Sequence, residues 1–210
     1  LGDVYKRQYI GDAIVAFYGA PVPVENHDIK SCYTALAMQK ALEELRLKWK
    51  KEKDWPDIVY SMQHRIGLNC GPMVTGNMGS EMRMNYTMMG DTVNLAARLE
   101  SSAKQYGVYN FVGENIYEVA KSKFAFRFLD FVQVKGKNIP VKVYELVASR
   151  DEILSDNINL IKLFEEGIDY YFKQDWKMAL NKFHKSENLE DKFESRNTTP
   201  SQIYIERCNM

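Results

Sequence analysis

The sequence predicts an α+β fold, in which helices pack on a β-sheet, followed by a short α-helical C-terminal segment. From residue 9 to about residue 148, segments that alternate apolar and polar residues are interleaved with segments of helical period. Around Ser149–Ser155 the pattern changes to helix only. The 210 residues suffice for one domain of ordinary size and an appendage.

The composition excludes several function classes. Lys plus Arg and Asp plus Glu both number 28, so no overall field favours nucleic acid or a membrane surface as a partner. No run approaches the roughly 18 apolar residues of a membrane span, so we expect no membrane segment in this chain. The cysteines lack a CxxC pair, which indicates a reducing compartment and a cytoplasmic protein. Because the cysteines and histidines are scattered, no His/Cys metal site is expected from Cys32, Cys70, Cys208, His27, His64 and His184.

The first 17 residues contain a foreign-looking leader and a predicted hairpin. Residues 1–8 resemble translated adapter sequence, so two interpretations stay open, a native segment or a foreign leader. Residues 9–17 favour two short strands around a Gly-Asp turn. Asp12 in that turn either bonds nearby amides as a turn former or projects a carboxylate that suits Mg²⁺.

Residues 27–107 predict a long helix, three strands and a central helix. The first helix begins at His27 or Asp28 and ends before Pro56. The three strands are expected over residues 62–70, 73–76 and 82–87. The stretch Asn85–Glu100 then turns at Gly90-Asp91 into an Ala- and Leu-rich helix, with Asp91 or Thr92 as the expected N-cap.

The central helix carries a candidate binding face. Asn94 and Arg98 are four residues apart and therefore share one face, while Leu95 and Leu99 share the neighbouring, core-facing side. A carboxamide beside a guanidinium can hold an oxygen-rich anionic ligand. The alternative is an ordinary solvated helix face.

Further strands and helices complete the domain and a tail. Strands are expected over 108–112, 124–128 and 141–147, with a short helix over 114–121. The Lys-Gly-Lys turn at 135–137 is either solvated or able to clamp phosphates. Residues 150–210 resemble one incomplete helix–turn–helix unit of the tetratricopeptide type, which by analogy suggests a protein partner.

Five ordered blocks together resemble the class III nucleotidyl cyclase domain over residues 9–149. They are Tyr-Ile-Gly-Asp-Ala-Ile at 9–14, Arg-Ile-Gly-Leu-Asn at 65–69, Gly-Asn-Met-Gly-Ser at 76–80, the stretch at 85–100, and Val-Lys-Gly-Lys at 134–137. The resemblance implies a ferredoxin-like sheet of mostly antiparallel strands with packed helices. It also implies that the family's first strand and helices, with one metal-binding carboxylate, are missing upstream; Asp3 does not match that carboxylate.

The resemblance implies adenylate cyclase activity, which converts ATP to 3′,5′-cyclic AMP and pyrophosphate in intracellular signal transduction. Two Mg²⁺ (or Mn²⁺) ions per site are implied, with Asp12 as one ligand. Arg98 corresponds to the residue that stabilises the α-phosphoryl transition state, and Asn94 to the residue that orients the ribose. Lys135 corresponds to a ligand of the terminal phosphates.

The resemblance leaves the substrate base and the catalytic competence open. Thr87 occupies a base-reading position and favours ATP, whereas Gln8 stands where adenylyl enzymes have lysine. The family builds its site across a homodimer, so a homodimer is expected. The alternatives are a guanylate cyclase, or an inactive cyclase-like module that binds nucleotide or dimerises. This truncated chain by itself is expected to turn over little or nothing.

Overall fold

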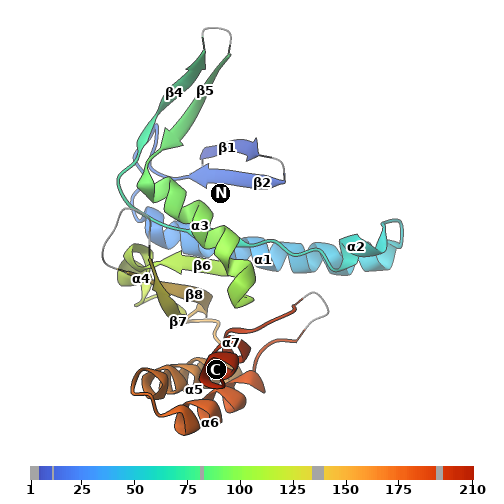
Figure 1. The fold of residues 1–210 in the computed structure, drawn as a ribbon. Helices are drawn as coiled ribbons and strands as arrows, with labels where there is room; N and C mark the ends of the chain where they lie inside the picture. The colour runs from blue at the N-terminus through green and yellow to red at the C-terminus, as the bar shows by residue number, and fades with distance from the viewer. Residues whose placement is uncertain (1–4, 11, 81–82, 134–139, 193–195) are drawn as a thin grey trace.

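The computed structural model describes residues 5–10, 12–80, 83–133, 140–192 and 196–210. Helices pack beside small sheets, which confirms the predicted α+β class (Figure 1). The central sheet has the order β3-β6-β8-β7, in which β3 is parallel to β6 and the other pairs are antiparallel. Its strands are β3 (Ile66–Leu68), β6 (Asn110–Gly113), β7 (Phe124–Val132) and β8 (Val141–Ser149).

Two antiparallel ribbons lie outside the central sheet. One is the predicted N-terminal hairpin, formed by β1 (Tyr5–Ile10) and β2 (Ala13–Phe17). The other consists of β4 (Val74–Ser80) and β5 (Arg83–Met89) and projects away from the body of the molecule (Figure 1). The helices are α1 (His27–Glu52), α2 (Asp57–Tyr60), α3 (Asp91–Tyr106), α4 (Glu114–Ala120), α5 (Ser155–Phe172), α6 (Trp176–Glu187) and α7 (Pro200–Cys208). None of these helices is long and apolar enough to cross a membrane.

One core cluster joins the cyclase-like region to the helical tail. It contains Leu99 of α3, Phe111 of β6, Leu129 of β7, and Phe164 and Tyr204 of the tail, each at most 2% exposed. The Tyr204 hydroxyl donates a hydrogen bond of 2.8 Å to the Leu129 carbonyl. The tail therefore packs directly on the sheet, and its three helices confirm the helical segment; its kinship to tetratricopeptide repeats stays a prediction.

The predicted strand over residues 62–70 is too long, because only Ile66–Leu68 pair with a neighbouring strand. Upstream of Ile66 the backbone carbonyls bond instead to side chains of α1. Arg46 donates to the Met62 carbonyl at 2.8 Å, and Gln39 donates to the His64 carbonyl at 3.4 Å. These contacts hold the segment against the helix rather than in the sheet.

The predicted N-cap of the central helix is also wrong. Gly90 occupies the cap with φ 145°, a backbone conformation that favours glycine, and no side chain caps the helix. Asp91 lies in the first turn, while the Thr92 hydroxyl donates to the Pro72 carbonyl at 2.8 Å. The Thr92 hydroxyl is therefore used in a tertiary hydrogen bond and does not cap the helix.

Candidate functional site

Helix α3 presents the predicted polar pair to solvent. Leu95 and Leu99 are 8% and 2% exposed, and Asn94 and Arg98 lie on the exposed side of the same helix. Within the described ranges, neither the Asn94 carboxamide nor the Arg98 guanidinium makes a hydrogen bond or ion pair. Both groups are therefore available to an anionic ligand.

The start of α3 is held in place by the loop that follows β3. The Asn69 carboxamide donates to the Thr92 carbonyl at 3.0 Å, and Thr92 bonds back to Pro72. Beneath the helix, Gly67 lies so close to α3 that a Cβ on it would fall 2.2 Å from the Ala96 carbonyl oxygen. The loop and this glycine fix the position of the helix that carries Asn94 and Arg98.

Strand β5 leads directly into α3 and carries Thr87. Its side chain is half-buried, and its cross-strand partner is Gly76 of β4. Residues directly opposite one another point to the same face of a ribbon, so no side chain lies directly across from Thr87. A Cβ on Gly76 would meet nothing within 4 Å, so the space over Gly76, across the ribbon from Thr87, is open.

Asp12 lies in the turn between β1 and β2. Its carboxylate is exposed, and no hydrogen bond or ion pair links it to Thr87, Asn94 or Arg98 in the described part of the chain. The hairpin itself packs on β5, since the rings of Phe17 and Tyr86 stack with centroids 6.2 Å apart. The structure thus brings the hairpin to the strand of Thr87 without bringing the side chains together. Lys135 falls outside the described residues.

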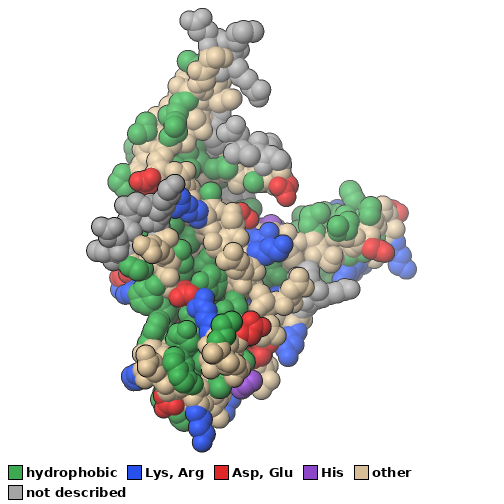
Figure 2. Space-filling view, in the orientation of Figure 1, with side chains coloured by type: hydrophobic (Ala, Val, Ile, Leu, Met, Phe, Trp, Pro, Cys, Tyr) green, Lys and Arg blue, Asp and Glu red, His purple; other side chains and the backbone are tan. Residues whose placement is uncertain are grey.

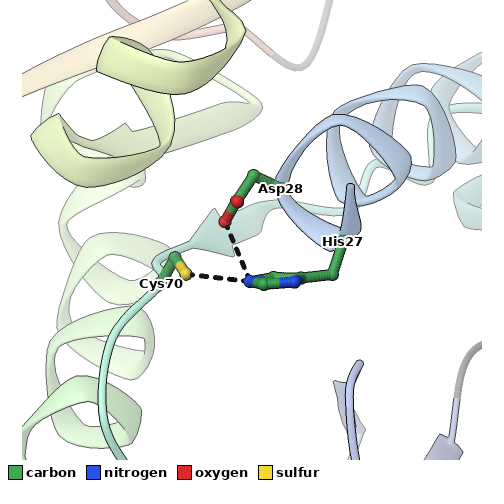
Figure 3. A group of neighbouring side chains, drawn as sticks. All are labelled: His27, Asp28 and Cys70. Carbon is green, nitrogen blue, oxygen red and sulfur yellow. Dashed lines mark hydrogen bonds and ion pairs between the residues drawn. The ribbon is translucent and has the colours of Figure 1, made fainter. Parts of the chain in front are cut away.

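A cluster that sequence reasoning missed lies at the start of α1. His27 and Asp28 begin this helix, and Cys70 approaches them from the loop after β3 (Figure 3). The His27 Nε2 atom lies 3.3 Å from the Cys70 Sγ and 3.3 Å from the Asp28 Oδ1. Burial and the neighbouring Asp28 carboxylate raise the pKa of the Cys70 thiol to about 12, so it is protonated at neutral pH. Cys70 is 43 residues from His27, so no local spacing signals the cluster.

Comparison with known proteins finds one family over most of the chain. The model of the adenylate and guanylate cyclase catalytic domain matches residues 2–148. Adenylate cyclase 1 of Rhizobium meliloti (strain 1021) is 33% identical over 140 residues, which are 67% of this chain and only 20% of that protein. The chain therefore spans about a fifth of the length of this relative.

Solved structures of both adenylyl and guanylyl enzymes share the fold. The adenylyl cyclase CyaB from P. aeruginosa gives a TM-score of 0.61 at 27% identity, over 72% of this chain and 75% of that chain. The guanylate cyclase domain of RhGC from Catenaria anguillulae, in complex with GTP, gives a TM-score of 0.54 at 28% identity, over 70% and 74% of the two chains. Because the family model matches residues 2–148, the chain belongs to the adenylate and guanylate cyclase catalytic domain family.

Proposed function

We propose that this chain is most of the catalytic domain of an adenylate cyclase, which converts ATP to 3′,5′-cyclic AMP and pyrophosphate for intracellular signalling. In this reaction the ribose 3′-oxygen bonds to the α-phosphorus, the bond from that phosphorus to the bridging oxygen breaks, and the hydroxyl proton is lost. The observation that carries the proposal is the unpaired Asn94 and Arg98 on α3, directly after the strand of Thr87. The comparisons support a cyclase and include enzymes of both nucleotides.

The proposed roles follow the chemistry of each side chain. The Arg98 guanidinium stabilises charge that grows on the α-phosphoryl group, and the Asn94 carboxamide orients the ribose. The Thr87 hydroxyl accepts a hydrogen bond from the adenine amino group in the open space opposite Gly76. Lys135, outside the described residues, is assigned to the terminal phosphates.

The residues present fit one half of a divalent metal site. Asp12 is an exposed carboxylate with no described partner, and oxygen donors of this kind suit Mg²⁺ or Mn²⁺. Bound metal would neutralise the triphosphate and acidify the attacking hydroxyl. Asp12 would hold it together with the carboxylate that the family resemblance implies upstream of this sequence.

A homodimer is supported by apolar side chains on the projecting ribbon. Val74, Met84 and Met89 of β4 and β5 are 66%, 61% and 60% exposed. Hydrophobic atoms gather over this ribbon in Figure 2. A second copy of the chain would cover them and bring one chain's Asp12 toward the partner's α3.

The tail as a docking site for another protein, and the cytoplasmic location, stay predictions.

The direct test is Arg98→Ala in the full-length gene product, which would include the implied upstream carboxylate. We expect cyclic AMP formation to fall by about 100-fold or more, because a transition-state donor is lost. Lys104→Ala, on the exposed last turn of the same helix, is the matched control and should leave turnover unchanged. Light scattering should find both variants with the oligomeric state of the parent. Unchanged turnover in Arg98→Ala would remove this residue from the mechanism.

The choice of nucleotide has its own test. We expect a higher kcat/KM for ATP than for GTP, and Thr87→Val should lower the ATP value by about tenfold, because an isosteric side chain without the hydroxyl loses one hydrogen bond. The GTP rate of the same variant is the internal control and should change little. A clear preference of the parent enzyme for GTP would reverse the assignment to a guanylate cyclase.

An inactive nucleotide-binding or dimerisation module is the remaining candidate, favoured by Gln8 at the base-reading lysine position. Sequencing the coding DNA upstream of Tyr9 decides between them. An upstream aspartate, with lysine in place of Gln8, completes the metal and purine sites. A native Gln8 with no such aspartate would refute the enzyme proposal.

A further inference from the structure

The cluster at the start of α1 combines three different metal-ligand types from two parts of the chain. The His27 nitrogen, the Asp28 carboxylate oxygen and the Cys70 sulfur all lie within 4.8 Å of one another (Figure 3). In a tetrahedral Zn²⁺ site, bonds of about 2.0 Å to nitrogen and about 2.3 Å to sulfur place those two atoms about 3.5 Å apart. The observed separation of 3.3 Å between His27 Nε2 and Cys70 Sγ is close to this value.

The second nitrogen of the imidazole is already oriented as in a metal ligand. His27 Nδ1 lies 3.2 Å from the Val24 carbonyl oxygen, and since a carbonyl can only accept, Nδ1 is the donor. In the neutral ring this leaves a lone pair on Nε2, directed at Cys70 and Asp28. A backbone carbonyl on the far nitrogen is the usual outer-shell partner of a ligating histidine.

The Asp28 carboxylate has a vacant acceptor in the same place. Its Oδ1 atom is buried and makes no hydrogen bond to any described residue, although it lies 3.3 Å from His27 Nε2. Lone pairs facing each other at this distance need either a cation or a shared proton between them, and the thiol of Cys70 is the neighbouring donor that a cation would replace. The Asp28 side chain is 13% exposed and that of His27 is 43% exposed, so an ion can enter from the histidine side.

We propose that His27, Asp28 and Cys70 form a Zn²⁺-binding site with water as the fourth ligand. Sulfur and imidazole nitrogen select a borderline cation such as Zn²⁺ over Mg²⁺, whose ligands are oxygen atoms. Binding displaces the thiol proton of Cys70 to solvent. The site is thus chemically separate from the Mg²⁺ ligand assigned to Asp12.

Zinc here would tie α1 to the loop that supports the catalytic helix. The Asn115 carboxamide donates to the Cys70 carbonyl at 2.8 Å, and the adjoining Asn69 donates to Thr92 at the start of α3. An ion on Cys70 therefore links the first turn of α1 to this braced loop. We expect it to raise the midpoint of thermal unfolding, because it binds the folded chain and the unfolded chain has no assembled site.

The test is titration of the metal-free full chain with Zn²⁺ in excess Mg²⁺, followed by calorimetry. We expect one equivalent per chain, and His27→Gln and Cys70→Ser should each weaken binding by about tenfold or more. Cys208→Ser removes a thiol elsewhere and is the matched control. Co²⁺ in place of Zn²⁺ should show thiolate-to-metal absorption in the parent chain and none in Cys70→Ser.

A second readout needs no variant and therefore does not depend on a mutant that folds. Zn²⁺ should slow alkylation of Cys70 by iodoacetamide, measured by peptide mass spectrometry, while Cys208 in the same sample is modified at an unchanged rate. The site would be overturned if no Zn²⁺ bound, or if His27→Gln and Cys70→Ser both bound Zn²⁺ as tightly as the parent chain. It would also be overturned if Zn²⁺ did not slow the alkylation of Cys70.

Discussion

At the scale of single residues, Gly67 sets how closely helix α3 approaches the sheet. A Cβ at this position would lie 2.2 Å from the Ala96 carbonyl oxygen and 2.5 Å from the Glu100 amide nitrogen, both in the backbone of α3. Backbone atoms of a helix cannot turn aside as a flexible side chain can. Gly67→Ala should therefore push α3 off β3 and destabilise the fold by about 1–3 kcal/mol.

The measurement for Gly67 is thermal unfolding followed by circular dichroism. Gly76→Ala is the matched control, because it places the same methyl group in another strand where nothing lies within 4 Å. We expect a lower midpoint for Gly67→Ala and an equal or slightly higher one for Gly76→Ala. Equal midpoints for the two variants would contradict the close contact of α3 with β3.

At the scale of elements, the sequence predicts those features of helices and strands that depend on residues close together in the chain. The two neighbouring faces of α3, with Leu95 and Leu99 inside and Asn94 and Arg98 outside, follow from helical periodicity alone, and the structure confirms the burial of both leucines. The N-terminal hairpin follows in the same way from its Gly-Asp turn. The catalytic and binding roles assigned to these residues stay predictions.

Elements whose limits are set by distant parts of the chain could not be predicted. Local sequence predicts Asp91 or Thr92 as the N-cap, but the Thr92 hydroxyl donates to the carbonyl of Pro72, 20 residues upstream. The meeting of His27 with Cys70 likewise depends on how α1 packs beside the loop after β3. Local sequence contains no information about such contacts, since they form only when the whole domain folds.

At the scale of the whole molecule, a buried ion network fastens the tail to the sheet. Arg127 of β7 is 1% exposed and binds Glu145 of β8 and Glu190 of the tail, each at 2.5 Å. Glu190 also accepts from Arg196 at 3.0 Å and from the Ser201 hydroxyl at 2.9 Å. Because these charges are shielded from water, each depends on its partners, and loss of one leaves another uncompensated.

This network makes the docking of the tail sensitive to pH. Burial alone would raise the pKa of Glu190, but the Arg127 and Arg196 guanidiniums and the Ser201 hydroxyl together lower it below its usual value of 4.5. A carboxyl with a lowered folded-state pKa adds stability above its unfolded-state pKa and loses it as the pH falls through the folded-state value. Glu190→Gln should therefore lower the free energy of unfolding by about 3 kcal/mol at neutral pH.

The difference between Glu190→Gln and the parent chain should shrink as the pH falls from 4.5 through the lowered folded-state pKa of Glu190, because the parent carboxyl is then protonated as well. Urea unfolding at several pH values measures it, and Glu118→Gln is the matched control, since this glutamate pairs with Lys121 on the exposed face of α4. The control should follow the parent at every pH. A constant difference between Glu190→Gln and the parent from neutral to acid pH would show that Glu190 acts through packing rather than through its charge.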